Sequence, residues 1–310
     1  MKRKLLHILL LSLISIAGVA RQPLHYATLQ INTIDREFYY YIPSGVSANP
    51  ALIFVLHGAT MHAKGMELAT GHQFDYLADE HKNAIIVYPQ GYKRRWNTCR
   101  ISGSGEAKQL DIDDISFIEK MIDFFASQYN INRESVFVMG FSNGAQMCYK
   151  LAREKPELFK GFAAVSANLP IKDNDGCYES NQPVSILIMN GTSDPIDPYN
   201  GGEMNLPGAA PGSVVSTEQN INYWKSLAKC DSVTGTEYDF PDIDKSDNST
   251  AVEYDYKSTA TNKEVVLVKI INGGHNVPNP TFSFWPRYLG NVNKDINAPE
   301  IIFDYFMGLK

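Results

Sequence analysis

The stretch Gly140-Phe141-Ser142-Asn143-Gly144 decides the fold class of this chain. It directly follows the apolar run 136–139 and precedes the helix-like stretch 145–153, so the local order is strand, sharp turn, helix. Glycine on both sides lets the backbone turn tightly and leaves the serine hydroxyl exposed at the end of the strand. The pattern predicts a nucleophilic serine, Ser142, and the alternative is a glycine-rich turn with no chemical role.

Short apolar runs alternate with helical patterns along the rest of the chain. The clearest runs are apolar on both faces, as parallel strands covered by helices on each side require; they are residues 52–56, 84–88, 136–139, 184–189 and 265–271. Segments 26–32 and 36–42 alternate more strongly between apolar and polar residues and predict an antiparallel start of the sheet. This order predicts the α/β class with a mostly parallel, doubly wound sheet.

Amphipathic segments supply the predicted helices. One covers residues 115–125, with Asp111 and Asp114 as candidate caps, and another covers 221–228 behind a Ser216/Gln219 capping box. Residues 299–306 predict a closing helix with proline in its first turn. No internal repeat or linker divides the chain, so we expect one domain over residues 21–310.

The first 20 residues have the pattern of a secretory signal peptide. Basic residues at 2–4 precede an apolar run at 5–16, and the small residues at 18 and 20 fit cleavage after Ala20. The alternative is an uncleaved, membrane-tethered helix. No other segment is long and apolar enough to span a membrane, so we expect a secreted or periplasmic protein without a membrane partner after cleavage.

Charge and cysteine usage exclude other classes of partner. Removing three basic residues with the signal peptide takes the net charge from −6 to −9, which argues against nucleic acid. The cysteines Cys99, Cys148, Cys177 and Cys230 allow three full disulfide pairings, and Cys148 is equally a candidate buried thiol. No C-x-x-C or H-x-x-x-H spacing occurs, so we expect no metal site.

A serine nucleophile needs a base, and the base needs an orienting acid. His275 is the only one of seven histidines that lies beyond Ser142, and it follows the apolar run 265–271. Asp194 lies just beyond the run 184–189 and is the predicted acid, with Asp197 as its rival. The chain order serine, acid, histidine is that of α/β-hydrolases.

The predicted oxyanion hole uses two backbone N–H groups. Asn143, next to the nucleophile at a helix start, supplies one, and Ala59 in the loop after residues 52–56 supplies the other, with Thr60 as the alternative. His57 in the same loop is interpreted as a structural, hydrogen-bonded histidine rather than a second base.

Several motifs together resemble secreted esterases of the α/β-hydrolase fold, a group that includes feruloyl esterases, acetylxylan esterases and short polyhydroxybutyrate depolymerases. The resemblance extends over roughly residues 36–307 and rests on Leu56-His57-Gly58, the pentapeptide around Ser142, Gly191-Thr192-Ser193-Asp194-Pro195 and Gly273-Gly274-His275. It implies hydrolysis of esters with no cofactor. The short segment 166–183 leaves no room for a large lid.

The chain departs from this family at three places. Asn276-Val277-Pro278-Asn279 stands where these enzymes often carry Trp-Pro-Gly, and Asp197 replaces a residue that tends to be apolar. A cysteine often found near residues 256–261 is absent, so the resemblance implies that Cys230 pairs with Cys177 or stays free.

The open cleft implied by these features favours a polymer-borne substrate. We expect loops 92–110, 199–212 and 277–292 to form it, with Trp96, Tyr199 and Trp285 stacking on a sugar or an aromatic acyl group. The resemblance implies a secreted serine esterase for feruloyl or acetyl esters on plant cell-wall polysaccharide such as xylan. The alternatives are a polyhydroxybutyrate oligomer depolymerase and a non-catalytic carbohydrate-binding relative.

Overall fold

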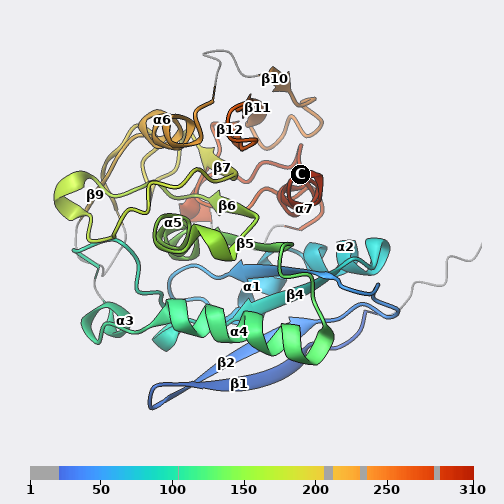
Figure 1. Ribbon diagram of the computed structural model, residues 1–310. Helices are drawn as coiled ribbons and strands as arrows, with labels where there is room; N and C mark the ends of the chain where they lie inside the picture. The colour runs from blue at the N-terminus through green and yellow to red at the C-terminus, as the bar shows by residue number, and fades with distance from the viewer. Residues whose placement is uncertain (1–20, 104, 206–211, 231–235, 283–286) are drawn as a thin grey trace, which may run out of the picture.

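A large twisted sheet forms the centre of the computed structural model, which describes residues 21–103, 105–205, 212–230, 236–282 and 287–310 (Figure 1). The predicted signal peptide lies outside these residues. Within them the sheet has ten strands, in the spatial order β1 (His25–Ile31), β2 (Ile34–Tyr41), β4 (Ala84–Pro89), β3 (Ala51–Leu56), β5 (Val136–Phe141), β6 (Gly161–Val165), β7 (Ile186–Gly191), β12 (Glu264–Ile271), β11 (Thr250–Lys257) and β10 (Thr236–Asp239). A separate two-stranded sheet pairs β8 (Gly202–Glu203) with β9 (Ser213–Val214).

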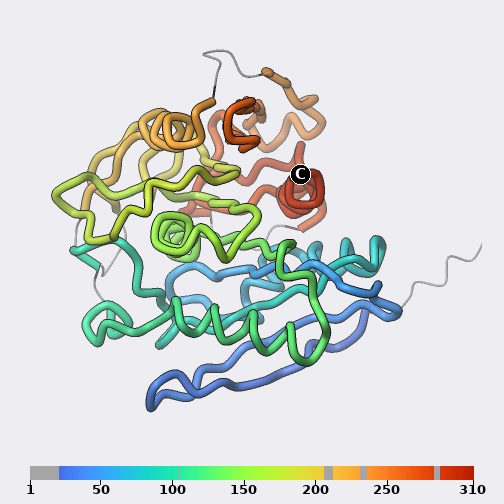
Figure 2. Tube along the Cα trace, viewed as in Figure 1, coloured from blue at the N-terminus to red at the C-terminus, as the bar shows by residue number. Residues whose placement is uncertain are grey.

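The middle of the large sheet is parallel and both of its edges are antiparallel. Strands β4, β3, β5, β6, β7 and β12 run parallel to one another, whereas β1 and β2 pair antiparallel at one edge and β11 and β10 at the other. Figure 2 shows the N-terminal strands, in blue, and the C-terminal strands, in orange, at opposite ends of the molecule. The doubly wound α/β-hydrolase fold and its antiparallel start are thus confirmed.

Helices cover both faces of the sheet. One face packs against α4 (Asp114–Tyr129), α5 (Asn143–Glu154) and α6 (Thr217–Ala228), and the other against α1 (Ala63–Ala69), α2 (Gln73–His81) and α7 (Ala298–Gly308). The one-turn helix α3 (Glu106–Gln109) lies in the loop before α4. Every residue of β3 is buried, because alternate side chains enter the two hydrophobic cores.

The structure shows the N-caps of both helices for which the sequence predicted a capping side chain, and α7 has the predicted proline in its first turn. The Ser216/Gln219 capping box before α6 is confirmed by both of its hydrogen bonds. The cap of α4 is instead Asp113, whose carboxylate accepts from the Ser116 N–H at 2.9 Å, so the prediction of Asp111 or Asp114 is wrong. Asp114 is buried in the first turn, where it forms an ion pair with Arg36 at 2.7 Å.

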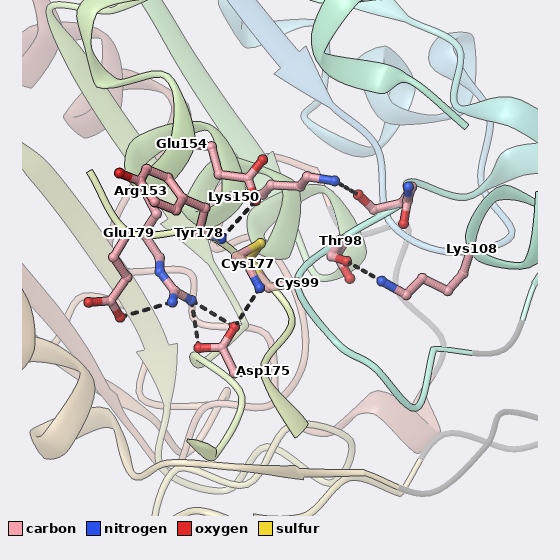
Figure 3. Close-up of a disulfide and its surroundings, with 11 residues drawn as sticks. Thr98, Cys99, Lys108, Lys150, Arg153, Glu154, Asp175, Cys177, Tyr178 and Glu179 are labelled. Atoms are coloured by element: carbon pink, nitrogen blue, oxygen red, sulfur yellow. Dashed lines mark hydrogen bonds and ion pairs between the residues drawn. A yellow bond between two sulfur atoms is a disulfide. The ribbon is translucent and has the colours of Figure 1, made fainter. Parts of the chain in front are cut away.

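One disulfide joins Cys99 to Cys177 (Figure 3). The suggestion that Cys230 pairs with Cys177 is therefore wrong; the Cys230 thiol lies 3.5 Å from the Tyr256 carbonyl oxygen. Burial raises the pKa of the Cys148 thiol well above its usual range, so this thiol is a core group.

An ion-pair cluster lies beside the disulfide. The Arg153 guanidinium, near the end of α5, sits between the carboxylates of Asp175, at 2.8 Å, and Glu179, at 2.9 Å (Figure 3). Because Arg153 is 3% exposed, these contacts fasten the loop between β6 and β7 to the nucleophile helix. Among the described residues, no helix is long and apolar enough to cross a membrane.

Candidate active site

Ser142 stands in a strained turn between β5 and α5. Its backbone angles are φ 53° and ψ −116°, a conformation that is costly for a residue with a side chain. Added Cβ atoms at Gly140 and Gly144 would collide with the Gly144 and Leu56 carbonyls respectively. The two glycines of the pentapeptide are therefore required by the close approach of the turn to the helix start and to β3.

The loop after β12 brings His275 to this serine. His275 Nε2 lies 2.9 Å from Ser142 Oγ, and its Nδ1 lies 2.8 Å from Asp194 Oδ2. The backbone N–H of His275 donates to the Leu289 carbonyl, which fixes the backbone of the base beyond the carboxyl end of β12. The ring packs against Phe141, with centroids 5.1 Å apart, and the residue is 4% exposed.

Asp194 is held as an acceptor from both of its oxygens. While Oδ2 faces the His275 ring, Oδ1 accepts from the backbone N–H groups of Ile196, at 2.8 Å, and Asp197, at 2.9 Å. These three hydrogen bonds to one buried carboxylate fix its orientation. The structure thus places Asp194, and not Asp197, against the histidine that faces Ser142.

The two predicted oxyanion residues lie at adjacent strand ends. Asn143 is the first residue of α5, and its side-chain oxygen accepts from the Trp96 N–H at 2.8 Å. Ala59 lies in the turn after β3, whose Leu56 is in register with Gly140 of β5. The Thr60 N–H, the alternative donor, is engaged by the Arg94 carbonyl at 2.9 Å. This arrangement favours Ala59 over Thr60.

His57, in the same loop, is a fully buried structural residue. Its Nε2 accepts from the Gly91 N–H at 2.9 Å, and its Nδ1 lies 2.7 Å from the Gly58 carbonyl, so the neutral ring protonated at Nδ1 satisfies both contacts. Burial lowers the pKa of His57 to about 4. A histidine whose acceptor nitrogen is occupied by a backbone N–H has no free site for a proton from substrate.

The predicted aromatic platform needs correction. Trp96 is 2% exposed, and its indole N–H donates to the His57 carbonyl at 2.9 Å. The buried indole therefore supports the loop that holds Ala59, which is called the oxyanion loop below. Tyr199 is 5% exposed and its ring lies 5.0 Å from Lys269 Nζ. Neither ring is available for stacking on a substrate, and Trp285 lies outside the described residues.

A buried amide network behind the loop that holds Asp194 was not predicted from the sequence. The Asn168 side chain, just after β6, donates to the Asp197 carboxylate at 3.1 Å and accepts from Asn190 and Thr217, each at 3.1 Å. These residues come from four separate segments, so no local pattern groups them. A hint was available only at Asp197, an acid where the resembling family tends to be apolar.

One group of acidic and histidine side chains has a spacing that suits a cation. Ligand atoms of Glu67, His72 and Asp75 lie within 4.8 Å of one another. The Arg21 guanidinium already donates to Glu67 and, at 2.7 Å, to Asp75. The chain itself therefore supplies a cation to this group, whose residues lie on and between α1 and α2.

Comparisons with known proteins agree with this architecture. The Esterase family, whose description is "Putative esterase", matches residues 32–209, more than half of the chain. Acetylxylan esterase A of Talaromyces purpureogenus is 26% identical over 253 residues, which cover 77% of this chain and 64% of the relative. The protein named "Probable feruloyl esterase C" of Aspergillus niger is 29% identical over 208 residues, 63% of this chain and 70% of the relative.

The fold itself recurs in a solved structure. The acetyl xylan esterase from Aspergillus awamori superposes with a TM-score of 0.57 at 15% identity, covering 82% of this chain and 95% of that one. The chain spans less than two thirds of the length of the Talaromyces relative. The family match over more than half of its length shows that the chain belongs to the Esterase family.

Proposed function

We propose that this protein is a secreted serine esterase that hydrolyses carboxylic esters through an acyl-enzyme on Ser142. The observation that carries the proposal is the continuous contact from Ser142 Oγ through the His275 ring to Asp194, at 2.9 and 2.8 Å. Both distances lie within hydrogen-bond reach, which is the first requirement for a nucleophile, its base and the orienting acid. The esterase domain comprises residues 21–310 in this proposal.

Acylation uses the neutral His275 ring as general base. Ser142 Oγ attacks the ester carbonyl carbon while its proton passes to His275 Nε2, and the carbonyl oxygen becomes an oxyanion. The N–H groups of Asn143 and Ala59 stabilise that charge, each worth about 3 kcal/mol of barrier. Asp194 stabilises the imidazolium that forms.

Deacylation reuses the same groups. The carbon–oxygen bond to the alcohol breaks as His275 returns its proton to the leaving oxygen, which releases the alcohol and leaves an ester on Ser142. Water then attacks this acyl group while His275 Nε2 takes its proton. The proton returns to Ser142 Oγ as the carboxylic acid leaves, so this chemistry needs no cofactor.

The substrate we propose is a feruloyl or acetyl ester carried by a plant cell-wall polysaccharide. Support comes from the names of two relatives, acetylxylan esterase A and feruloyl esterase C. The short connection between β6 and β7 also supports it, because it holds no lid that would enclose a lipid tail. Export of the mature chain would bring the enzyme to such a polymer.

The test is turnover of p-nitrophenyl acetate, p-nitrophenyl butyrate and methyl ferulate by residues 21–310. We expect hydrolysis that Ser142→Ala reduces by at least ~10⁴-fold. A matched control is Ser166→Ala, because Ser166 also has positive φ at a strand end but its hydroxyl donates to the Asn276 carbonyl. A folded protein without Ser142-dependent turnover of any ester would contradict the proposal.

Two further measurements test its details. The ratio of acetate to ferulate turnover distinguishes the two acyl groups, and faster cleavage of 3-hydroxybutyrate oligomers would replace both. The N-terminal residue of protein recovered from the medium or periplasm tests export. We expect it to be Arg21, and an intact Met1 would contradict cleavage.

A further inference from the structure

A second carboxyl group is buried directly behind the acid of the proposed triad. Asp197 is 3% exposed, and its backbone N–H donates to Asp194 Oδ1 at 2.9 Å. Its own Oδ1 accepts from Asn168 Nδ2 at 3.1 Å. Its Oδ2 is buried and has no hydrogen-bond partner among the described residues.

The neighbouring network fixes how Asn168 meets this carboxyl. Asn168 Oδ1 accepts from Asn190, at 3.1 Å, Thr217, at 3.1 Å, and Asn220, at 3.3 Å. With three donors on its oxygen, the amide can present only its NH₂ group to Asp197. The Asn168 amide therefore holds Asp197 Oδ1. Asp197 Oδ2 has no hydrogen-bond partner among the described residues to offset the cost of its burial.

The charged and titratable groups around Asp197 come from several elements. Burial, followed by the charge of Asp194, raises the pKa of Asp197 to about 7, whereas the positive charge of His275 opposes this rise. Arg100 and Tyr149 also interact electrostatically with Asp197. The side chain therefore changes charge near neutral pH, beside a histidine that becomes positive during the reaction.

We propose that Asp197 is a positioning residue whose buried carboxylate places a second negative charge behind the Asp194–His275 pair. The inference rests on the proposed function and deepens it. When ionised, Asp197 attracts the imidazolium that forms as Ser142 attacks, so it lowers the barrier. When protonated, Asp197 has no charge, and Asp194 alone stabilises the imidazolium.

The test compares Asp197→Asn with the unmodified protein, using kcat/KM for p-nitrophenyl acetate from pH 5 to 9.5. The asparagine keeps the shape and the bond from Asn168 but has no charge. We expect about a tenfold lower plateau above pH 8 and an acid limb whose midpoint moves down by about one pH unit. KM should change little. Asp173→Asn, an exposed carboxylate, is the matched control and should behave like the unmodified protein.

A second readout keeps the test independent of turnover. In the Ser142→Ala background, the NMR titration midpoint of the His275 ring should move down in Asp197→Asn by the same amount. If the unmodified protein has no Ser142-dependent activity, the proposed function fails and this titration still tests Asp197. Should Asp197→Asn fail to fold, Asp197→Leu removes the same charge with the apolar character of the resembling family.

Two results would overturn the inference. Superimposable pH profiles and ring titrations would show that the charge of Asp197 does not change the titration of the His275 ring. A uniform loss of activity at all pH values, with an unmoved midpoint, would show that Asp197 is only structural.

Discussion

Two loops at the carboxyl edge of the sheet each bury a histidine, and only one of these rings faces a nucleophile. His57 follows β3 and His275 follows β12, and they are 0% and 4% exposed. His57 Nε2 accepts from a backbone N–H at 2.9 Å, whereas His275 Nε2 faces Ser142 Oγ at 2.9 Å. Burial and position at a strand end are therefore shared, and the partner of one nitrogen decides the role of the ring.

The opposite nitrogens differ as well. His57 Nδ1 lies against the Gly58 carbonyl, while His275 Nδ1 lies against the Asp194 carboxylate. A carbonyl dipole holds a neutral ring in place, but a carboxylate also stabilises the positive ring. The loop after β3 thus suits a rigid site for a backbone N–H donor, and the loop after β12 suits a histidine that accepts and returns a proton.

Removal of the His275 ring should have the largest effect on activity. We expect His275→Ala to lower kcat for p-nitrophenyl acetate by about 10⁴- to 10⁶-fold, because His275 is the base that contacts Ser142 Oγ. The matched variant is His57→Gln, which should lose no more than about a hundredfold through the oxyanion loop. Initial rates at pH 8 with both folded variants measure this difference. Equal losses would mean that the two histidines are not functionally distinct.

A smaller effect is expected when the charge behind His275 is removed. Asp194→Asn should reduce kcat by about 10²- to 10⁴-fold, since an amide stabilises the wrong tautomer and does not stabilise the imidazolium. Asp197→Asn, three residues away, should stay within about a tenfold loss. A larger loss in Asp197→Asn than in Asp194→Asn, measured under identical conditions, would reverse the assignment of the acid.

The neutrality of His57 should appear in the pH dependence of stability. Its pKa is lowered to about 4 by burial, so the unfolded chain binds a proton there before the folded chain does. The stability that depends on a neutral His57 is thus complete above about pH 6.5 and is lost as the pH falls towards 4, by up to about 3 kcal/mol.

Urea unfolding at pH 7, 5.5 and 4.5 measures this loss by difference. The unmodified protein should lose more stability on acidification than His57→Gln does, because glutamine does not titrate. Other groups titrate equally in both proteins and cancel in the comparison. Parallel pH dependences would contradict a buried, neutral His57.

Local signals explain what could be predicted from the sequence. Ser142, Asp194 and His275 each lie just beyond an apolar run, and parallel strands bring their carboxyl ends to one edge. The capping box before α6 is a local four-residue pattern, so it could also be predicted from the sequence. Such features depend on neighbours in the chain, so a single sequence contains them.

Other features depend on contacts between distant segments. The role of Trp96 could not be read, because an aromatic residue in a loop packs inward or faces solvent without a local difference in sequence. The cap of α4 was misplaced because Asp114 is bound by Arg36, 78 residues earlier. Strand β6, Gly161–Val165, was missed because its small residues lack a strong strand preference.

The smallest effect concerns the support beneath the oxyanion loop. Trp96→Phe keeps most of the buried ring but removes the N–H that donates to the His57 carbonyl at 2.9 Å, which leaves a buried acceptor unpaired. We expect a loss of about 1–2 kcal/mol in urea unfolding and about a threefold to tenfold lower kcat, with an unmoved acid limb. Trp224→Phe is the matched control, because this equally buried indole donates to Asn220 at 2.9 Å on α6. It should lose similar stability but keep kcat within about twofold, and equal kcat losses in both variants would show that the effect of Trp96 is general destabilisation rather than support of the loop that holds Ala59.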